Sequence, residues 1–138
     1  MGHLDTVNAF DTAFNAQQWD KAASYLTDDF TLSDGKETEG KREFIEGAKV
    51  WFAGAPDYHV TVDNLRVEGD AVYGVMRATG TQTKPLAFPG MPPIPATGKR
   101  FAITANLMSQ MRGGQIASTT LTLTSPGLLA QLGVQPPA

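Results

Sequence analysis

The clearest pattern of apolar and polar positions lies between Lys99 and Thr124. Its first half alternates strictly, and one face carries Phe101, Ile103, Ala105, Leu107, Ser109 and Met111. A period of two predicts a strand with one covered face. Gly113-Gly114 supplies the positive φ of a tight hairpin turn, and a return strand from Gln115 to Thr124 alternates threonine with leucine. Because a long hairpin twists, we expect it to form the floor and wall of a cup.

Helical spacing of apolar residues predicts three helices before this hairpin. The first extends from about Leu4 to Asn15, the apolar face of the second runs from Trp19 to Leu26, and that of the third from Phe44 to Phe52, before a stop at Gly54 to Asp57. Asp28-Asp29 ends the second helix. Between the second and third helices, Phe30 to Leu32 predicts a short strand, and the polar segment from Ser33 to Gly40 predicts a loop.

A second hairpin is predicted from Tyr58 to Gln82, with its turn at Glu68-Gly69-Asp70. The segment from Thr83 to Gly98 contains five prolines and is predicted to be an ordered loop or a frayed edge, because proline has no donor for a strand ladder. The loop is also apolar, so we expect it to lie over another part of the molecule; whether it is a lid stays open. Gly127 to Leu132 predicts a terminal helix, and residues 133–138 a tail.

Helices followed by long antiparallel strands indicate an α+β arrangement. A chain of 138 residues fits one domain spanning residues 1–138. Residues 1–3 can come from an expression vector, so His3 is given no weight. A curled sheet closed on one side by the three helices predicts a conical cavity.

Composition excludes several classes of protein. The net charge is −3, which does not favour binding to nucleic acid or to an anionic membrane. The chain has no cysteine, so disulfides, thiolate catalysis and cysteine zinc sites are excluded. No apolar run approaches the roughly 20 residues of a membrane span, and the N-terminus lacks the pattern of a signal peptide. We therefore expect a cytoplasmic protein.

Several short segments together resemble the SnoaL-like polyketide cyclase group of the nuclear transport factor 2-like superfamily. They include Ala13-Phe14-Asn15-Ala16, Leu26-Thr27-Asp28-Asp29-Phe30, Val67-Glu68-Gly69-Asp70, Ala78-Thr79-Gly80-Thr81 and Pro95 to Arg100. Their order and spacing indicate the fold more than the chemistry. The resemblance implies a cone-shaped α+β barrel with a deep apolar pocket, commonly in a homodimer built on the outer face of the sheet. It also implies activities ranging from cyclases, isomerases and hydrolases to non-enzymatic binding proteins.

This sequence departs from the family where acid–base chemistry is usual. The last long strand of family members tends to carry a Glu-His-Trp-Asp type run, whereas this chain has Ser118-Thr119-Thr120-Leu121. An acidic residue is often found near the position of Leu107. Between Phe101 and Thr124 the only charged side chain is Arg112. These departures argue against a cyclase mechanism carried over intact.

Three residues remain as weak catalytic candidates. His59 could act as a general base with Asp57 or Asp63, but its alternation with Tyr58 and Val60 favours an exposed position, and Asp63 shares that face. Arg77 could polarise a carbonyl or hold an anion if its strand face lines the cavity. The resemblance instead aligns a usual tryptophan near Met76, which favours Met76 inside. An epoxide-hydrolase set fails because the later strands carry no aspartate.

We expect no metal and no cofactor, because no histidine clusters with carboxylates at ligand spacing. The sequence predicts an apolar pocket for a small hydrophobic ligand, in either a cyclase- or isomerase-like enzyme or a non-catalytic binding or dimeric scaffold domain. The expected ligand-binding residues are mostly aromatic or apolar, with a few polar groups to orient the ligand: Phe14, Trp19, Tyr25, Phe30, Trp51, Tyr58, Met76, Phe88, Met91, Leu107, Ser109 and Thr120.

Overall fold

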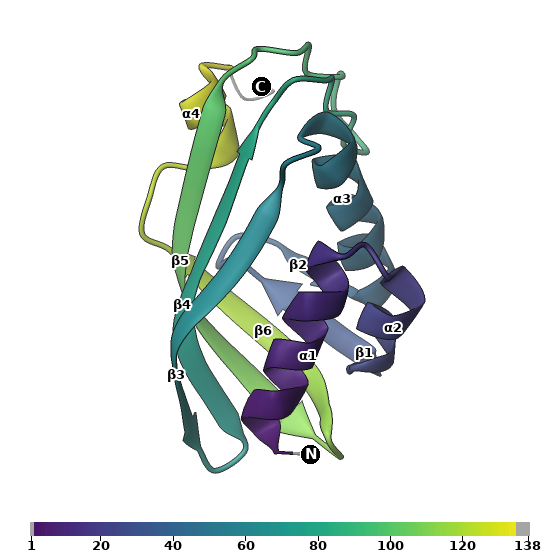
Figure 1. Cartoon of the computed structure of the whole chain (residues 1–138), viewed down its shortest axis with the longest axis vertical. Helices are drawn as coiled ribbons and strands as arrows, with labels where there is room; N and C mark the ends of the chain where they lie inside the picture. The colour runs from purple at the N-terminus through teal and green to yellow at the C-terminus, as the bar shows by residue number, and fades with distance from the viewer. Residues whose placement is uncertain (1, 135–138) are drawn as a thin grey trace.

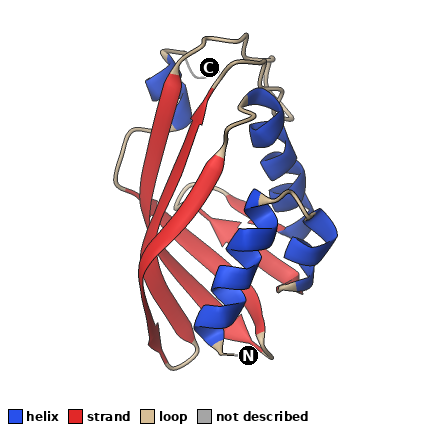
Figure 2. Ribbon diagram, viewed as in Figure 1, coloured by secondary structure: helices blue, strands red, loops and turns tan. Residues whose placement is uncertain are grey.

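Six strands form one curved sheet, and three helices cover its concave side (Figures 1 and 2). The computed structural model describes residues 2–134. The elements follow the order α1 (His3–Asn15), α2 (Trp19–Ser24), β1 (Leu26–Ser33), β2 (Thr38–Gly40), α3 (Lys41–Gly54), β3 (His59–Glu68), β4 (Ala71–Thr81), β5 (Arg100–Arg112), β6 (Gln115–Leu123) and α4 (Leu128–Leu132). The predicted α+β cone is confirmed. Most of the predicted tail, residues 135–138, lies outside the described residues.

The strands lie in the order β2-β1-β6-β5-β4-β3. The long strands β3 to β6 pair antiparallel in chain order, as the two predicted hairpins require. The pairing of β1 with β6 is parallel, and it places the last strand of the chain beside the first. This last contact closes the sheet around the helices.

Alternation along β5 decides which face of the sheet is covered. Phe101 is 1% exposed and Ala105 is completely buried, while Asn106 is exposed. Met76 of β4 lies opposite Ala105, and Val60 of β3 lies opposite Ala78 of β4. The inner face therefore continues from β5 across β4 to β3 with the same apolar character.

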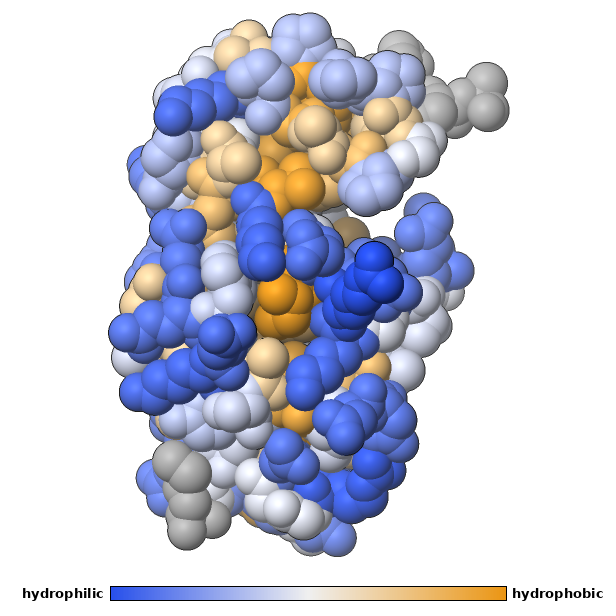
Figure 3. Space-filling view, turned by 90° about the vertical axis from the view of Figure 1, so that its right-hand side faces the viewer, coloured by the Kyte–Doolittle hydropathy of each residue, from blue (hydrophilic) through white to orange (hydrophobic). Residues whose placement is uncertain are grey.

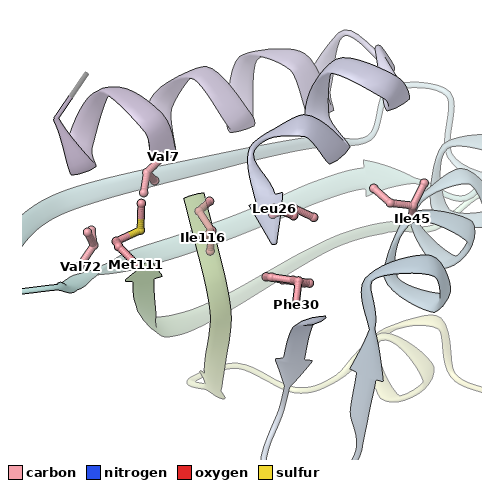
Figure 4. Packing of buried hydrophobic residues seen from close by; sticks show 7 residues of the cluster. All are labelled: Val7, Leu26, Phe30, Ile45, Val72, Met111 and Ile116. Atoms are coloured by element: carbon pink, nitrogen blue, oxygen red, sulfur yellow. The ribbon is translucent and has the colours of Figure 1, made fainter. Parts of the chain in front are cut away.

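The lower part of the core joins every layer of the fold (Figure 4). Val7 of α1 points toward Met111 of β5, while Leu26 and Phe30 of β1 face Ile45 of α3. Burial of this apolar surface favours folding by about 25 cal/mol for each Å² removed from water. The cluster comprises Val7, Leu26, Phe30, Ile45, Val72, Met111 and Ile116.

The predicted boundary between the second helix and the first strand is wrong. α2 ends at Ser24, and Leu26 already belongs to β1. Asp28 and Asp29 therefore lie in a strand, both exposed, where the register between β1 and β6 shifts. An irregularity of this kind lets two successive side chains face solvent without ending the strand. The end of the predicted loop from Ser33 to Gly40 also forms the short strand β2.

Side-chain amides cap unpaired backbone on two strands near the upper end of the cone, one on the edge strand β3 and one on β5 beyond the end of β6. The amide of Asn15 donates to the carbonyl of Val60 at 2.8 Å and accepts from its N–H at 2.9 Å. On the other side, Gln131 of α4 makes the same two-way contact with Ala102, at 2.9 and 2.8 Å. Each amide occupies the place of a missing neighbouring strand and blocks an edge that could pair with another chain.

The proline-rich loop between β4 and β5 is ordered and lies over the end of α3 (Figure 1). Leu86 and Ile94 exchange two backbone hydrogen bonds, at 3.0 and 2.8 Å, and both are buried in the upper core. Gln82 is fully buried at the base of the loop. Only the tip, residues 87–93, extends beyond this closure.

Candidate functional site

The upper half of the cone is filled by an aromatic cluster. The rings of Trp51 and Tyr58 stack with centroids 5.1 Å apart, and Phe52 meets Tyr58 edge-on at 5.1 Å. Trp51 also contacts Phe101 of the sheet and Phe88 of the loop tip, at 5.6 and 5.7 Å. Offset and edge-on pairs of this kind add to the stabilisation from burial. The cluster thus joins α3, β5 and the loop into one apolar wall.

Tyr58 is the polar group within this wall. Burial raises the pKa of its hydroxyl well above the usual range, so the group stays protonated at neutral pH. A protonated phenol in apolar surroundings can donate a hydrogen bond to a carbonyl oxygen. Tyr58 is therefore suited to orient a ligand.

A second polar feature of the inner face is a pair of hydroxyls. Ser109 of β5 and Thr119 of β6 are both buried, and their oxygens are 2.8 Å apart. Because each hydroxyl satisfies the other, neither needs a further partner. Thr120 follows Thr119 and lies opposite Met108 on the outer face. It therefore cannot line the same cavity as Ser109.

The three predicted catalytic candidates lie on the outer side of the sheet. His59, Asp63 and Arg77 are all exposed, and Arg77 lies opposite Thr61 in the register of β3 and β4. The alternation that places Met76 inside necessarily places Arg77 outside. None of the three can act on a ligand within the cone.

The other predicted ligand-binding residues divide between the two halves of the cone. Phe14 and Trp19 form an edge-on pair at 5.5 Å beneath the aromatic cluster. Met76 and Met91 pack against the upper core, whereas Phe30 belongs to the lower core. Leu107 is half-buried on the inner face of β5, and Tyr25 is half-buried at the end of α2. Ring contacts thus connect Phe14 to Trp19 and Tyr58, and Tyr58 through Trp51 to Phe88.

Asp11 is an ionisable group of the helical layer that sequence reasoning missed. It follows Val7 by four residues and precedes Phe14 by three, and both neighbours are buried. Its Oδ2 atom is buried and has no hydrogen-bond partner among the described residues. Burial raises the pKa of this carboxyl from its ordinary value to about 7. A charged residue beside an otherwise apolar helix stripe was the signal that could have identified it.

A shallow hollow of about 580 Å³ lies where α2, β1 and the start of α3 meet. Two of its charged side chains pair with each other, with Lys41 Nζ 3.8 Å from Asp28, and a third, Asp29, pairs with Arg112 outside the hollow. The hydrogen bond from Arg112 holds the pKa of Asp29 below its usual value, and a second one from Thr27 adds to this effect. The hollow is lined by Ala23, Asp28, Asp29, Phe30, Thr31, Gly40, Lys41, Arg42, Glu43 and Ile45.

The side of the molecule that carries the helices has apolar as well as hydrophilic surface (Figure 3). Apolar side chains run in a broken band down the middle of this side, from the top of the molecule between hydrophilic side chains on both flanks. Half-buried apolar residues of α3, α4 and the loop tip pack against the upper core.

Within residues 2–134, no three His, Cys, Asp or Glu side chains are placed to hold a metal ion. No helix in this range is long and apolar enough to cross a membrane.

The sequence model of the SnoaL-like polyketide cyclase family matches residues 4–132. The chain belongs to this family. No curated protein sequence matches it. Solved structures similar to this SnoaL-like protein include TsrD from Streptomyces laurentii, with 23% identity, 96% of this chain and 95% of that chain covered, and a TM-score of 0.76.

Two further similar structures carry cyclase names. A candidate SnoaL-like polyketide cyclase from Jannaschia sp. CCS1 is 25% identical, with 96% of this chain and 92% of that chain covered and a TM-score of 0.76. IdmH from Streptomyces antibioticus, a candidate polyketide cyclase, is 26% identical over 94% of this chain and 97% of that chain, with a TM-score of 0.72. The fold and the family of this SnoaL-like protein are thus established on independent grounds.

Proposed function

We propose that this SnoaL-like protein binds a small, largely hydrophobic molecule at the upper end of the cone, as a cyclase- or isomerase-like enzyme. The observation that carries the proposal is the aromatic wall around Tyr58, which combines flat apolar surface with one protonated hydroxyl. Ligand sites commonly have this composition, with few polar groups in a mostly apolar lining. The names of IdmH and of the Jannaschia protein support a cyclic or cyclising ligand.

The loop tip is the segment that we propose moves to admit the ligand. Phe88 and Met91 pack from the tip onto the upper core, and Gly90 between them adopts a positive φ of 81°. The tip carries no strand pairing beyond the contact between Leu86 and Ile94. Moving the side chains of Phe88 and Met91 away from Trp51 and its neighbours costs less free energy than separating the β-strands below the loop tip.

A ligand screen tests this proposal. The panel contains an anthraquinone, a steroid, a terpenoid and a fatty acid, each added at increasing concentration to the wild type and to Tyr58→Phe. Because a ligand bound only to the folded state stabilises it, one class is expected to raise the Tm by about 5–10 °C at a 100-fold excess over Kd. Tyr58→Phe should weaken the response several-fold, while Arg77→Ala, on the outer face, should leave it unchanged. No response to any class would contradict the proposal.

The alternative is a non-catalytic binding protein, and one observation favours it. Within the described residues, the inner faces of β4, β5 and β6 carry hydroxyls and apolar side chains but no carboxylate or histidine. A ligand shift in the screen without turnover of any bound compound would support this alternative. Turnover would reject it.

We also propose that two copies of the chain pair through the outer face of β4, β5 and β6. This face carries few charges: Arg77 lies in its middle, Arg100 at the start of β5 and Arg112 beside the hairpin turn. Val75 on it is 36% exposed, beside Asn106 of β5. Charge depletion of this kind marks the central part of protein interfaces more than free surface.

Sedimentation velocity over a concentration series is expected to show a dimer. Val75→Glu should weaken dimerisation at least ten-fold, because a two-fold axis brings two new carboxylates into one apolar contact. Val67→Glu is the matched control, since Val67 is 43% exposed near the far end of β3. A monomer at all concentrations, or equal effects of the two substitutions, would contradict the proposal.

A further inference from the structure

A second hollow, of about 240 Å³, lies on the outer face of the sheet, away from the interior of the cone. Its lining combines a guanidinium, two carboxamides and a phenol hydroxyl, and it contains no carboxylate. The polar part of the lining therefore carries one positive charge and several hydrogen-bond donors. The hollow is lined by Asn64, Arg66, Tyr73, Gly74, Val75, Asn106 and Leu107 of β3, β4 and β5.

An irregularity in β3 shapes this hollow. The register between β3 and β4 shifts between Asp63 and Arg66, and Asn64 within this segment has a positive φ of 55°. Residues other than glycine rarely adopt this conformation, although asparagine tolerates it better than most. On β4, a Cβ atom at Gly74 would lie 2.6 Å from a methyl carbon of Leu65, so the glycine lets the shifted segment pack closely against β4. The backbone thus places both Asn64 and Arg66 at the hollow.

The guanidinium of Arg66 is oriented, but its charge is not neutralised. Its central carbon lies 4.9 Å from the centroid of the Tyr73 ring. A guanidinium that stacks on a ring still presents its N–H groups in its own plane. Asp63 and Glu68 on β3 are exposed, and Arg66 forms no ion pair within residues 2–134. An arginine in this state is suited to bind a carboxylate through two parallel hydrogen bonds.

We infer that this hollow binds a small aromatic carboxylate. Arg66 and the amides of Asn64 and Asn106 bind the carboxylate group, and Val75, which is 36% exposed, offers apolar surface to the ring. The volume lies below the roughly 300 Å³ at which pockets for larger ligands begin, so it suits a single ring rather than a polycyclic compound. The inference does not depend on the ligand proposed for the interior of the cone.

The test titrates sodium benzoate into the ¹⁵N-labelled full chain at constant ionic strength and follows the backbone amide signals by NMR. Benzoate is expected to shift the signals of residues 64–66, 73–75 and 106–107. Benzamide, which has the same ring without the charge, and inorganic phosphate should each bind at least about ten-fold more weakly. A response to benzamide equal to that of benzoate, or no response to benzoate, would overturn the inference. An equal response to phosphate would show a general anion site and overturn the assigned ligand class.

Two arginines of the outer face provide a matched comparison. Arg66→Ala should lower the affinity for benzoate at least about ten-fold, and Arg66→Lys, which keeps the charge but not the planar fork, should have an intermediate affinity. Arg77→Ala removes an exposed arginine of the same face that does not line the hollow, and it should bind benzoate as the wild type does. Equal losses in Arg66→Ala and Arg77→Ala would show that only the overall charge matters and would overturn the inference.

Val75 and Asn106 also lie on the face through which we propose that two copies pair. Sedimentation velocity with and without benzoate separates binding in the hollow from an effect on pairing. Signal shifts confined to the hollow support the inference in either oligomeric state. Shifts that spread over the outer face of β6, together with a changed sedimentation coefficient, would show that benzoate acts on pairing and would overturn it.

Discussion

The folded protein is expected to lose stability as the pH rises from about 4 to about 7, with Asp11 as the main cause. In this range the folded state keeps the proton on Asp11, whereas the unfolded chain, with a pKa of 3.8, has released it. Since the state that binds more protons is disfavoured as the pH rises, the free energy of unfolding falls by up to about 1.4 kcal/mol per pH unit. The total loss is at most about 4 kcal/mol, and the curve is flat above pH 7.

Other carboxyl groups also change the dependence of stability on pH, but they do so in another pH range or by a smaller amount than Asp11. Asp29, Asp34 and Asp57 have lowered pKa values, the first through Arg112 and the other two through backbone N–H groups. Their contribution is present above pH 4 and is lost below it. Burial raises the pKa of Glu39, so this residue adds a smaller fall in the same direction as Asp11. The interval between pH 4 and 7 therefore reports mainly on Asp11.

Asp11→Asn removes the titration and keeps the shape of the side chain. The variant should be more stable than the wild type at pH 8, by up to about 4 kcal/mol, and should lose most of the slope between pH 4 and 7. Urea denaturation followed by circular dichroism at constant ionic strength measures both quantities. Asp20→Asn serves as the control and should keep the full slope. A wild type without this slope, or an Asn variant that retains it, would show that Asp11 is not protonated in the folded state.

The antiparallel hairpins of the sheet could be predicted from the sequence because their alternation and their turns lie within short continuous segments. The alternation from Phe101 to Met111 and the turn at Gly113-Gly114 determine a strand, its inner face and its partner without information from elsewhere in the chain. The parallel contact between β1 and β6 could not be predicted in this way. It joins residues that are far apart in the sequence, and nothing local in β1 marks it, particularly where Asp28 and Asp29 imitate the end of a helix.

The site was harder to predict because it depends on which face of each element is covered. The sequence already favoured an outer position for His59 and for Arg77, but their places opposite Thr79 and Thr61 follow only from the strand register. Asp11 shows the opposite problem. On the helix it adjoins the apolar stripe of Val7 and Phe14, where a charged residue usually reaches solvent, and its oxygen is enclosed only once α1 packs in the fold.

Replacing Gln82 is expected to release the loop that covers the upper end of the cone. Its amide nitrogen donates to the carbonyls of Ile94 and Pro95, at 3.2 and 3.0 Å. Its amide oxygen accepts from the N–H and the hydroxyl of Thr97, at 3.0 and 2.7 Å. A single fully buried side chain thus holds the returning half of the loop. Without it, the Pro95 carbonyl and the Thr97 N–H have no described partner, whereas the Ile94 carbonyl still accepts from the N–H of Leu86. Truncation of the side chain also leaves a cavity.

Gln82→Ala should therefore lower the free energy of unfolding by about 3 kcal/mol or more. Thr97→Ala, which removes one of the four hydrogen bonds and no buried volume at the centre, should cost about 1 kcal/mol. Thr83→Ala, at an exposed neighbouring position, is the matched control and should have little effect. Urea denaturation measures these differences.

Limited proteolysis distinguishes movement of the whole loop from movement of its tip. In the wild type, cleavage is expected only within residues 87–93, beyond the contact between Leu86 and Ile94. In Gln82→Ala, cleavage should extend to residues 94–98, because these residues lose the side-chain hydrogen bonds that hold them to the base of the loop. If the wild type is already cut at the base, Gln82 does not anchor the loop, and the proposed opening at the tip would have to include all of residues 83–98. If the variant is cut only at the tip, the pair Leu86 and Ile94 is sufficient to close the cone.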